Sequence, residues 1–263
     1  MIGFIGCGNM GAAIIKGMIQ GGVEPNIIFA YDHNKNKIED ISAGINVCIS
    51  EKDVVAKSKY IFIAVKPYAY DNVLHEIKDV LDDEKIIITM AAGYEIKRVE
   101  AVVGYKKIIR TMPNTPSLVG KGFIAVSYNE FVNDSEKQYF EGLLRNIGLI
   151  KVIKEDLMNA YSAVTGSGPA FVFNFMEAMA DAAVLLGIPR KDAYAAVEMM
   201  ILGSAELALK TERHPAELKD MVTSPGGTTI EGIRTLEEKS LRSAIIECII
   251  NTYKKNLDIK NIR

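Results

Sequence analysis

The first eleven residues read MIGFIGCGNMG, an apolar run that ends in the pattern Gly6-x-Gly8-x-x-Gly11 and leads into a helical stretch at 12–18. In such a strand–turn–helix unit the first glycine permits a tight turn, and the second lets the backbone approach a pyrophosphate. The third lets the helix pack closely on the sheet, with its N-terminal amides directed at the phosphates. The order therefore predicts a dinucleotide-binding fold, with these residues at the cofactor: Gly6, Cys7, Gly8, Asn9, Met10 and Gly11.

An acidic residue, Asp32, ends the second β-rich run, about 20 residues after Gly11. At this place a carboxylate accepts hydrogen bonds from the adenosine ribose. It would also repel a 2′-phosphate, which favours NADH, whereas the neighbouring His33, Lys35 and Lys37 favour NADPH. Because such basic residues more often form a solvated first helical turn, we expect a preference for NADH.

Short β-branched runs alternate with amphipathic stretches up to about residue 153. This rhythm predicts βαβ units and a parallel sheet. The expected strands after the first are 27–31, 60–65, 85–89, 107–110 and 122–126. Beyond residue 154, Ala, Leu and Met dominate long segments, which predicts helices. We therefore expect an α/β protein: an N-terminal Rossmann-type parallel-sheet domain, 1–153, followed by an all-helical domain, 154–263.

Two segments of the helical half carry few charges. Segment 157–189 holds only Glu177 and Asp181, and segment 193–209 holds only Glu198 and Glu206. A helix that is apolar on nearly every face must be buried on nearly every face. A domain of about 110 residues has too little interior for two such helices. We therefore expect an obligate homo-oligomer, in which a second copy covers part of this surface.

Composition narrows the possible partners and compartment. The 263 residues include 31 Lys and Arg against 33 Asp and Glu, a balance that argues against a nucleic-acid-binding surface. Three widely spaced cysteines indicate neither a disulfide framework nor a metal site. The chain opens directly on a strand, without a signal-peptide pattern, and its longest charge-free run, 157–176, contains Gly and Pro. We expect a cytoplasmic protein without a membrane partner.

Three further motifs follow expected strands: AVKP at 64–67, AAG at 91–93 and RTMPNTP at 110–116. Ligands bind outside the carboxyl ends of strands in an open α/β sheet. Small residues and prolines there give a rigid backbone that a flat nicotinamide ring can approach closely. Taken singly, each motif could equally be a strand-ending turn. The cofactor candidates here are Ala64, Val65, Lys66, Pro67, Ala91, Ala92, Gly93 and Asn114.

The segment 223–230, TSPGGTTI, precedes an amphipathic run. Ser224 as N-cap, Pro225 at the first helical position and the exposed amides of the glycines describe a helix start that receives a small anion such as a carboxylate. The alternative is a well-capped helix without a ligand. Two glycines and two threonines weaken a helix while adding hydrogen-bond donors, which favours the ligand site.

Six motifs occur in one order along the chain: GFIGCGNMG, AVKP, MAAG, RTMPNTP, GSGPAF and VTSPGGTTIEG. Together they resemble the pyrroline-5-carboxylate reductase family, over essentially all of the sequence. The resemblance implies a Rossmann domain, a helical dimerisation domain and dimers that commonly assemble into a decamer. It also implies NAD(P)H-dependent hydride transfer to the cyclic imine 1-pyrroline-5-carboxylate, which gives L-proline.

The resemblance also implies roles for particular residues. It places the pyrophosphate at 6–10 and the rest of the dinucleotide at 64–67 and 91–93. Substrate binding falls to residues that the partner subunit contributes: Ser224, Gly227, Thr228 and Thr229. Glu155 and Glu212 match acidic positions of the family near the substrate.

Three positions depart from the family pattern. Asp32 and Glu51 stand where the family often has Ser, Arg or Asn at the adenosine ribose or its phosphate, which puts a preference for NADPH in doubt. Met221 replaces a usual amide side chain just before the PGG turn. One substrate hydrogen bond is therefore expected to be missing or mediated by water.

The implied reaction assigns catalytic tasks. A protonated imine is the better hydride acceptor, so we expect Glu212 or Glu155 to stabilise that cation and Thr229 to hydrogen-bond the forming amine. No dedicated proton donor is evident, and His214, beside Pro215, is expected at a helix boundary.

Two other functions remain open from the sequence. A β-hydroxyacid dehydrogenase shares the glycine-rich opening but carries a catalytic lysine four residues after its middle motif, where this chain has Val172. A dinucleotide-binding regulator without catalysis is the second alternative, and the PGGTT segment argues against it.

Overall fold

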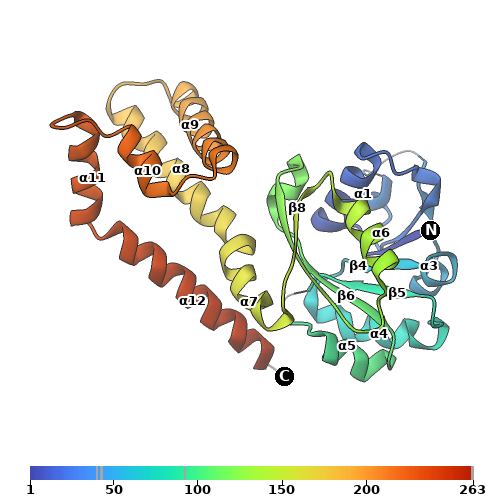
Figure 1. Cartoon of the computed structure of the whole chain (residues 1–263). Helices are drawn as coiled ribbons and strands as arrows, with labels where there is room; N and C mark the ends of the chain where they lie inside the picture. The colour runs from blue at the N-terminus through green and yellow to red at the C-terminus, as the bar shows by residue number, and fades with distance from the viewer. Residues whose placement is uncertain (40, 42–43, 92, 262–263) are drawn as a thin grey trace. The chain divides into compact units, whose positions relative to one another are not determined.

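The computed structural model describes residues 1–39, 41, 44–91 and 93–261, and it divides into two compact units (Figure 1). The first unit comprises Met1–Gly166 with Tyr253–Arg263, and the second comprises Ser167–Thr252. The first is α/β and the second is helical, which confirms the predicted fold class. The domain boundary between residues 153 and 154 stays a prediction.

The first unit is built on one eight-stranded sheet of order β3-β2-β1-β4-β5-β6-β7-β8. The strands are β1 Ile2–Ile5, β2 Ile28–Tyr31, β3 Asn46–Val47, β4 Tyr60–Ile63, β5 Ile86–Thr89, β6 Lys107–Met112, β7 Gly122–Tyr128 and β8 Gly148–Val152. All neighbours are parallel except β6 and β7. The predicted parallel sheet is therefore wrong at this pair, because the connection 113–121 is too short for the crossover that parallel strands need.

The two edge strands of the sheet, β3 and β8, are not among the strands expected from the sequence. β3 has only two residues, too few to show a period. β8 reads GLIKV, and its burial is only partial along its length. Both strands exist because a neighbour offers backbone partners, so they depend on tertiary pairing.

Helices cover both faces of the sheet (Figure 1). One face packs against α1 Asn9–Gln20, α2 Asn36–Glu39 and α6 Asp134–Leu144. The other packs against α3 Glu51–Lys57, α4 Tyr70–Ile77 and α5 Ile96–Val103. Strands buried on both faces need apolar side chains at successive positions, which explains the continuous runs of β1 and β4. The sheet is thus a rigid base whose strand ends carry the loops.

Short turns complete the first unit, and four helices together with most of a fifth form the second. The turns are η1 Pro25–Ile27, η2 Pro67–Ala69, η3 Lys78–Val80, η4 Thr115–Val119 and η5 Glu155–Leu157, followed by α7 Met158–Tyr161 and the π-helical η6 Ser162–Gly166. The helices are α8 Gly168–Leu185, α9 Arg190–Thr211, α10 Pro215–Met221, α11 Thr228–Glu238 and α12 Leu241–Asn261. His214 is the N-cap of α10, and its Nδ1 accepts from the Ala216 N–H (3.2 Å), which confirms its predicted boundary place.

The second unit leaves much of its apolar surface uncovered. Its described core cluster contains only Ala180, Ala193 and Val197 as buried residues. Phe173 on α8 and Leu209 on α9 are 60% and 75% exposed. No helix in the described part of the chain is long and apolar enough to cross a membrane. Among the same residues, no group of His, Cys, Asp and Glu side chains is arranged to hold a metal ion.

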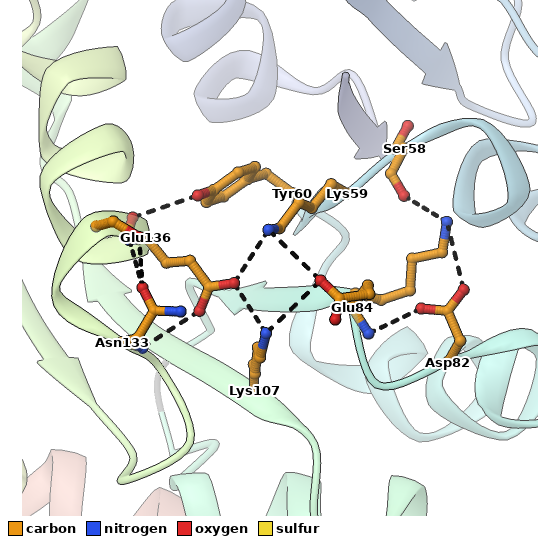
Figure 2. A network of polar contacts seen from close by, with 10 residues as sticks. Ser58, Lys59, Tyr60, Asp82, Glu84, Lys107, Asn133 and Glu136 are labelled. Atoms are coloured by element: carbon orange, nitrogen blue, oxygen red, sulfur yellow. Dashed lines mark hydrogen bonds and ion pairs between the residues drawn. The ribbon is translucent and has the colours of Figure 1, made fainter.

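A buried carboxylate joins the amino ends of two strands to α6 (Figure 2). Glu136 is 4% exposed, and its Oε1 lies 3.0 Å from the Nζ of Lys59 and 2.8 Å from the Nζ of Lys107. Its Oε2 accepts from the Asn133 N–H (3.2 Å). Burial by itself raises the pKa of Glu136, but the bonds from the two lysines and the Asn133 amide together lower it. The charged Glu136 carboxylate therefore links α6 to the amino ends of β4 and β6, on the side of the sheet opposite the glycine turn.

We expect Glu136→Gln to reduce the free energy of unfolding at pH 7 by about 2 kcal/mol, because it removes charge-assisted hydrogen bonds. A lowered pKa in the folded state gives stabilisation that is present above the unfolded value, near 4.3, and that is lost as the pH falls through the folded value. Urea unfolding of both proteins from pH 7 to pH 3 measures this. The difference should shrink only in the acid range, and a constant difference would contradict the assignment.

Candidate active site

The predicted cofactor residues gather at the edge of the sheet that is formed by the carboxyl ends of its parallel strands. Strands β1 to β6 run in the same direction, so their carboxyl ends share that edge. β1 lies between β2 and β4, where the strand order reverses, and this switch point is where open α/β sheets bind ligands. Ala92 lies outside the described residues. The others follow these strand ends or begin the next helix: Gly6–Gly11, Asp32, Glu51, Ala64–Pro67, Ala91, Gly93 and Asn114.

The three glycines of the β1–α1 turn have different surroundings. Gly6 has φ +97°, and a Cβ there would lie 2.8 Å from the backbone of Ala64. A Cβ on Gly11 would lie 2.5 Å from the Gly6 carbonyl oxygen, whereas one on Gly8 would meet no atom within 4 Å. Gly8 is the N-cap of α1 and supplies no side-chain cap. Gly6 and Gly11 thus serve the fold, while Gly8 leaves open space beside free amides, which fits a pyrophosphate.

Asp32 fixes this turn to the end of β2. It is 6% exposed, and its carboxylate accepts from the N–H groups of Cys7 (2.8 Å) and Asn34 (2.9 Å). Burial by itself raises the pKa of Asp32, but these two backbone bonds and Lys37, at 3.5 Å, outweigh it and lower the pKa. Burial and the Asp32 charge raise the pKa of the Cys7 thiol to about 12. Cys7 therefore contributes its backbone N–H, and not a thiolate, to the glycine turn. Asp32 keeps a negative charge at the end of β2.

A second carboxylate acts on the same region. Glu51 is the first residue of α3 and is half-buried. Burial, followed by the charges of Glu51 and Asp32, raises the pKa of Tyr31 at the end of β2. The charges of Glu51 and Asp32 therefore both act at the end of β2.

Tyr70 is a residue that the sequence analysis missed. Its buried hydroxyl donates to the Ile63 carbonyl at the end of β4 and accepts from the Met90 N–H (3.0 Å) after β5. Burial raises its pKa to about 12, so the hydroxyl keeps its proton. The sequence signal that could have identified Tyr70 is a tyrosine on the apolar face of a helix. A tyrosine buried in this way needs a polar partner for its hydroxyl. Tyr70 ties together the ends of two strands that carry predicted cofactor residues.

Asn114 and Glu155 are both engaged within the first unit. The Asn114 amide donates to the Thr165 carbonyl (2.9 Å) and accepts from the Phe123 N–H (2.9 Å). Glu155 Oε1 accepts from the Ile96 N–H (2.7 Å) and from Arg110 Nη1 (2.9 Å). Their predicted contacts with cofactor and substrate stay predictions.

In the second unit the predicted helix start lies three residues later than expected. α11 begins at Thr228 with Gly227 as N-cap, so Ser224 is not the N-cap and Pro225 is not the first helical residue. The Gly227 N–H donates to the Ser224 carbonyl (3.1 Å), and Gly226 has φ +67°. Proline followed by a glycine at positive φ forms a type II turn, which precedes the helix instead of opening it. The N-cap of α11 is a glycine and supplies no side-chain cap, which leaves the first amides of the helix available to an anion.

Glu212 ends α9 in an unusual backbone conformation. It has φ 53°, in the left-handed region, where residues with a Cβ are uncommon. The adjacent Arg213 donates from Nη1 to the sulfur of Met221 (3.2 Å), shortly before the turn. The second unit therefore brings the segment of Glu212 to the segment that leads into Thr228 and Thr229.

Comparison with known proteins decides the family. The family model described as pyrroline-5-carboxylate reductase dimerisation matches residues 155–259, and one described as NADP oxidoreductase coenzyme F420-dependent matches residues 1–93. The pyrroline-5-carboxylate reductase of Escherichia coli is 43% identical over 97% of this chain and 96% of its own. The chain belongs to the pyrroline-5-carboxylate reductase family. Its members are NAD(P)-dependent oxidoreductases.

Solved structures of pyrroline-5-carboxylate reductases have the same fold as this chain. A pyrroline-5-carboxylate reductase from Coxiella burnetii superimposes with a TM-score of 0.92 at 34% identity, covering 98% of this chain and 97% of that one. The Plasmodium falciparum enzyme, solved with NADP bound, gives a TM-score of 0.88 at 33% identity, covering 97% and 96%. Family membership sets aside the β-hydroxyacid dehydrogenase alternative.

Proposed function

We propose that this protein reduces 1-pyrroline-5-carboxylate to L-proline by hydride transfer from a reduced nicotinamide dinucleotide. The observation that carries the proposal is the uncapped start of α11 behind the Ser224–Gly227 turn, in a chain whose first unit holds an open glycine turn. Loss of NADH absorbance when pyrroline-5-carboxylate is added tests it. A protein that binds the dinucleotide but leaves the absorbance unchanged would instead be the non-catalytic regulator.

The first unit would hold the dinucleotide through its backbone. The open space at Gly8 and the free amides of α1 receive the pyrophosphate. The small residues Ala64, Ala91 and Gly93 leave room for the nicotinamide end. The bound dinucleotide supplies a hydride from its C4 position, and the protein supplies position and charge.

The second unit would hold the substrate. The Thr228 amide and the hydroxyls of Ser224 and Thr228 hydrogen-bond the carboxylate, while the Gly227 amide closes the turn that presents them, with these groups coming from the partner subunit. Thr229 hydrogen-bonds the ring nitrogen as the C=N bond accepts the hydride and its electron pair moves to nitrogen. Glu212 stabilises the protonated imine before transfer, because the Oε1 of Glu155 already accepts from the Ile96 N–H and from Arg110. The strained backbone of Glu212 supports a functional role there.

NADH is the preferred cofactor in our proposal, because Asp32 and Glu51 place negative charge where a 2′-phosphate would lie. We expect kcat/KM with NADH to exceed that with NADPH by about tenfold, and Glu51→Gln to raise the NADPH value about fivefold with little change for NADH. Steady-state kinetics with both cofactors measures this. Glu130→Gln, an equal charge change after β7, is the control and should alter neither value. A large NADPH preference of the wild type would refute the proposal.

The wild-type protein should be a dimer or larger at micromolar concentration, because the second unit exposes apolar side chains that one copy cannot cover. Light scattering measures the mass. We expect Phe173→Asp on α8 to shift the protein towards monomers, whereas Phe131→Asp, in the first unit, should not. A stable wild-type monomer would contradict self-association. Assembly of dimers into a decamer and a cytoplasmic location are further proposals of the same kind.

A further inference from the structure

The segment after β5 is held at its beginning by a buried hydroxyl. We call Met90, Ala91 and residues 93–95 the β5 loop. Its first amide, on Met90, donates to Tyr70, whose ring lies 4.5 Å from that of Tyr94. Ala91 is 5% exposed, and its carbonyl accepts from the Tyr94 N–H (3.4 Å). The loop carries Ala91 and Gly93, which are proposed to contact the dinucleotide.

The other end of the β5 loop is held by an ion pair. Ile96, the first residue of α5, donates its N–H to Glu155 Oε1, and the same oxygen accepts from Arg110. Arg110 pairs in register with Thr89, the last residue of β5, so it lies level with the start of the loop. Strand β6 and the start of α5 therefore meet at one carboxylate.

Arg110 is buried although two of its hydrogen-bond donors find no partner in the described residues. It is 1% exposed, and within the described chain its Nε and Nη2 have no hydrogen-bond partner. Desolvated donors without partners are unfavourable, and buried ion pairs are weak stabilisers compared with apolar packing. An apolar residue at this place in a strand would suit the sheet at least as well. The buried charge therefore points to a requirement other than stability.

We infer that Arg110 and Glu155 are positioning residues: their ion pair fixes the amino end of α5 and so holds the β5 loop in place for hydride transfer. This inference rests on the proposed function. In it, Glu155 acts through the Ile96 amide, and Arg110 acts by holding the Glu155 carboxylate. A small displacement of a positioned group can slow a reaction by orders of magnitude without weakening binding.

The test compares Arg110→Met, Glu155→Gln and the double variant with the wild type. We expect each single variant to slow single-turnover hydride transfer about tenfold and to enlarge the isotope effect of NADH deuterated at C4. The dissociation constant for NADH, measured by fluorescence without substrate, should change by less than about twofold, because the glycine turn provides the pyrophosphate contacts. The double variant should be no slower than the singles, because both remove one interaction.

A second pair of variants isolates the hydrogen bond from the charges. Proline is well tolerated at the first position of a helix, so Ile96→Pro removes only the donor N–H and some packing. Ile96→Ala loses packing but keeps the donor. The proline variant should slow hydride transfer more than the alanine variant, and this comparison remains valid if Arg110→Met fails to fold.

Glu136→Gln is the control for a merely structural effect, since Glu136 pairs with Lys107 at the opposite end of the same strand, β6. It should lose stability and keep the wild-type rate and isotope effect. The inference would be overturned by wild-type rates in both single variants, by multiplied losses in the double variant, or by an equal loss of rate in Glu136→Gln.

If the wild type itself does not reduce the imine, the proposed function fails. Hydrogen exchange of the Ile96 amide in the cofactor-free protein then still reports whether Arg110 holds Glu155 against the start of α5. Unchanged protection of this amide in Arg110→Met would overturn the inference.

Discussion

Thr229→Ala is expected to lower kcat/KM for the cyclic imine about a hundredfold, with little change in cofactor affinity. Thr229 lies in the first turn of α11, whose N-cap Gly227 supplies no side-chain cap. A donor directed at the atom where electrons accumulate stabilises the transition state more than the ground state, and its removal costs a factor of this size. Steady-state kinetics with varied imine, and NADH titration without imine, measure the two quantities.

Two matched variants separate the hydroxyl from the helix. Thr229→Ser keeps the hydroxyl and should retain most of the activity. Thr235→Ala removes a hydroxyl from the same helix, one that donates to the Glu231 carbonyl (3.0 Å), and should leave turnover unchanged. Near-wild-type turnover of Thr229→Ala would move the substrate site away from α11.

Gly8→Ala should weaken dinucleotide binding about a hundredfold while the protein stays folded. Gly8 has φ −69°, which alanine adopts without strain, and no protein atom lies within 4 Å of the added Cβ. The methyl group instead occupies the space assigned to the pyrophosphate. Because glycine and alanine differ as N-caps, the free energy of unfolding should fall by no more than about 1 kcal/mol. NADH titration and urea unfolding measure the two effects.

The other glycines give the contrast. Gly11→Ala places its Cβ 2.5 Å from the Gly6 carbonyl oxygen, so it should lower stability as well as binding. Gly142→Ala, on α6 with no neighbouring atom in reach, should leave binding unchanged. Wild-type NADH affinity in Gly8→Ala would contradict the placement of the pyrophosphate.

The sequence predicts those strands that are buried on both faces. Runs such as IGFI and YIFI keep their apolar character at every position, and all six expected strands occur, with ends shifted by one or two residues. The edges β3 and β8 and the reversed direction of β7 were not predicted. A two-residue strand has no period, and strand direction depends on the length of the connection.

The candidate site likewise has parts that the sequence predicted and parts that it did not. The glycine turn and the loops after β4 and β5 were predicted because backbone approach to a ligand requires small residues at fixed places. The start of α11 was placed wrongly, since Ser-Pro can begin a helix or a type II turn and the positive φ of Gly226 selects the turn. Tyr70 and Arg110 could not be assigned from the sequence, because their partners lie on other strands and helices.

The sequence by itself determined the family, the α/β class and the edge of the sheet that carries the glycine turn, because glycine spacing and apolar periodicity express local backbone requirements. Only the tertiary structure decided which polar groups hold that edge: the Asp32 carboxylate on the Cys7 amide, the Tyr70 hydroxyl between β4 and β5, and the Arg110–Glu155 pair at α5. Such contacts join residues far apart in the chain. Their formation depends on the packing of the whole sheet, which no local pattern encodes.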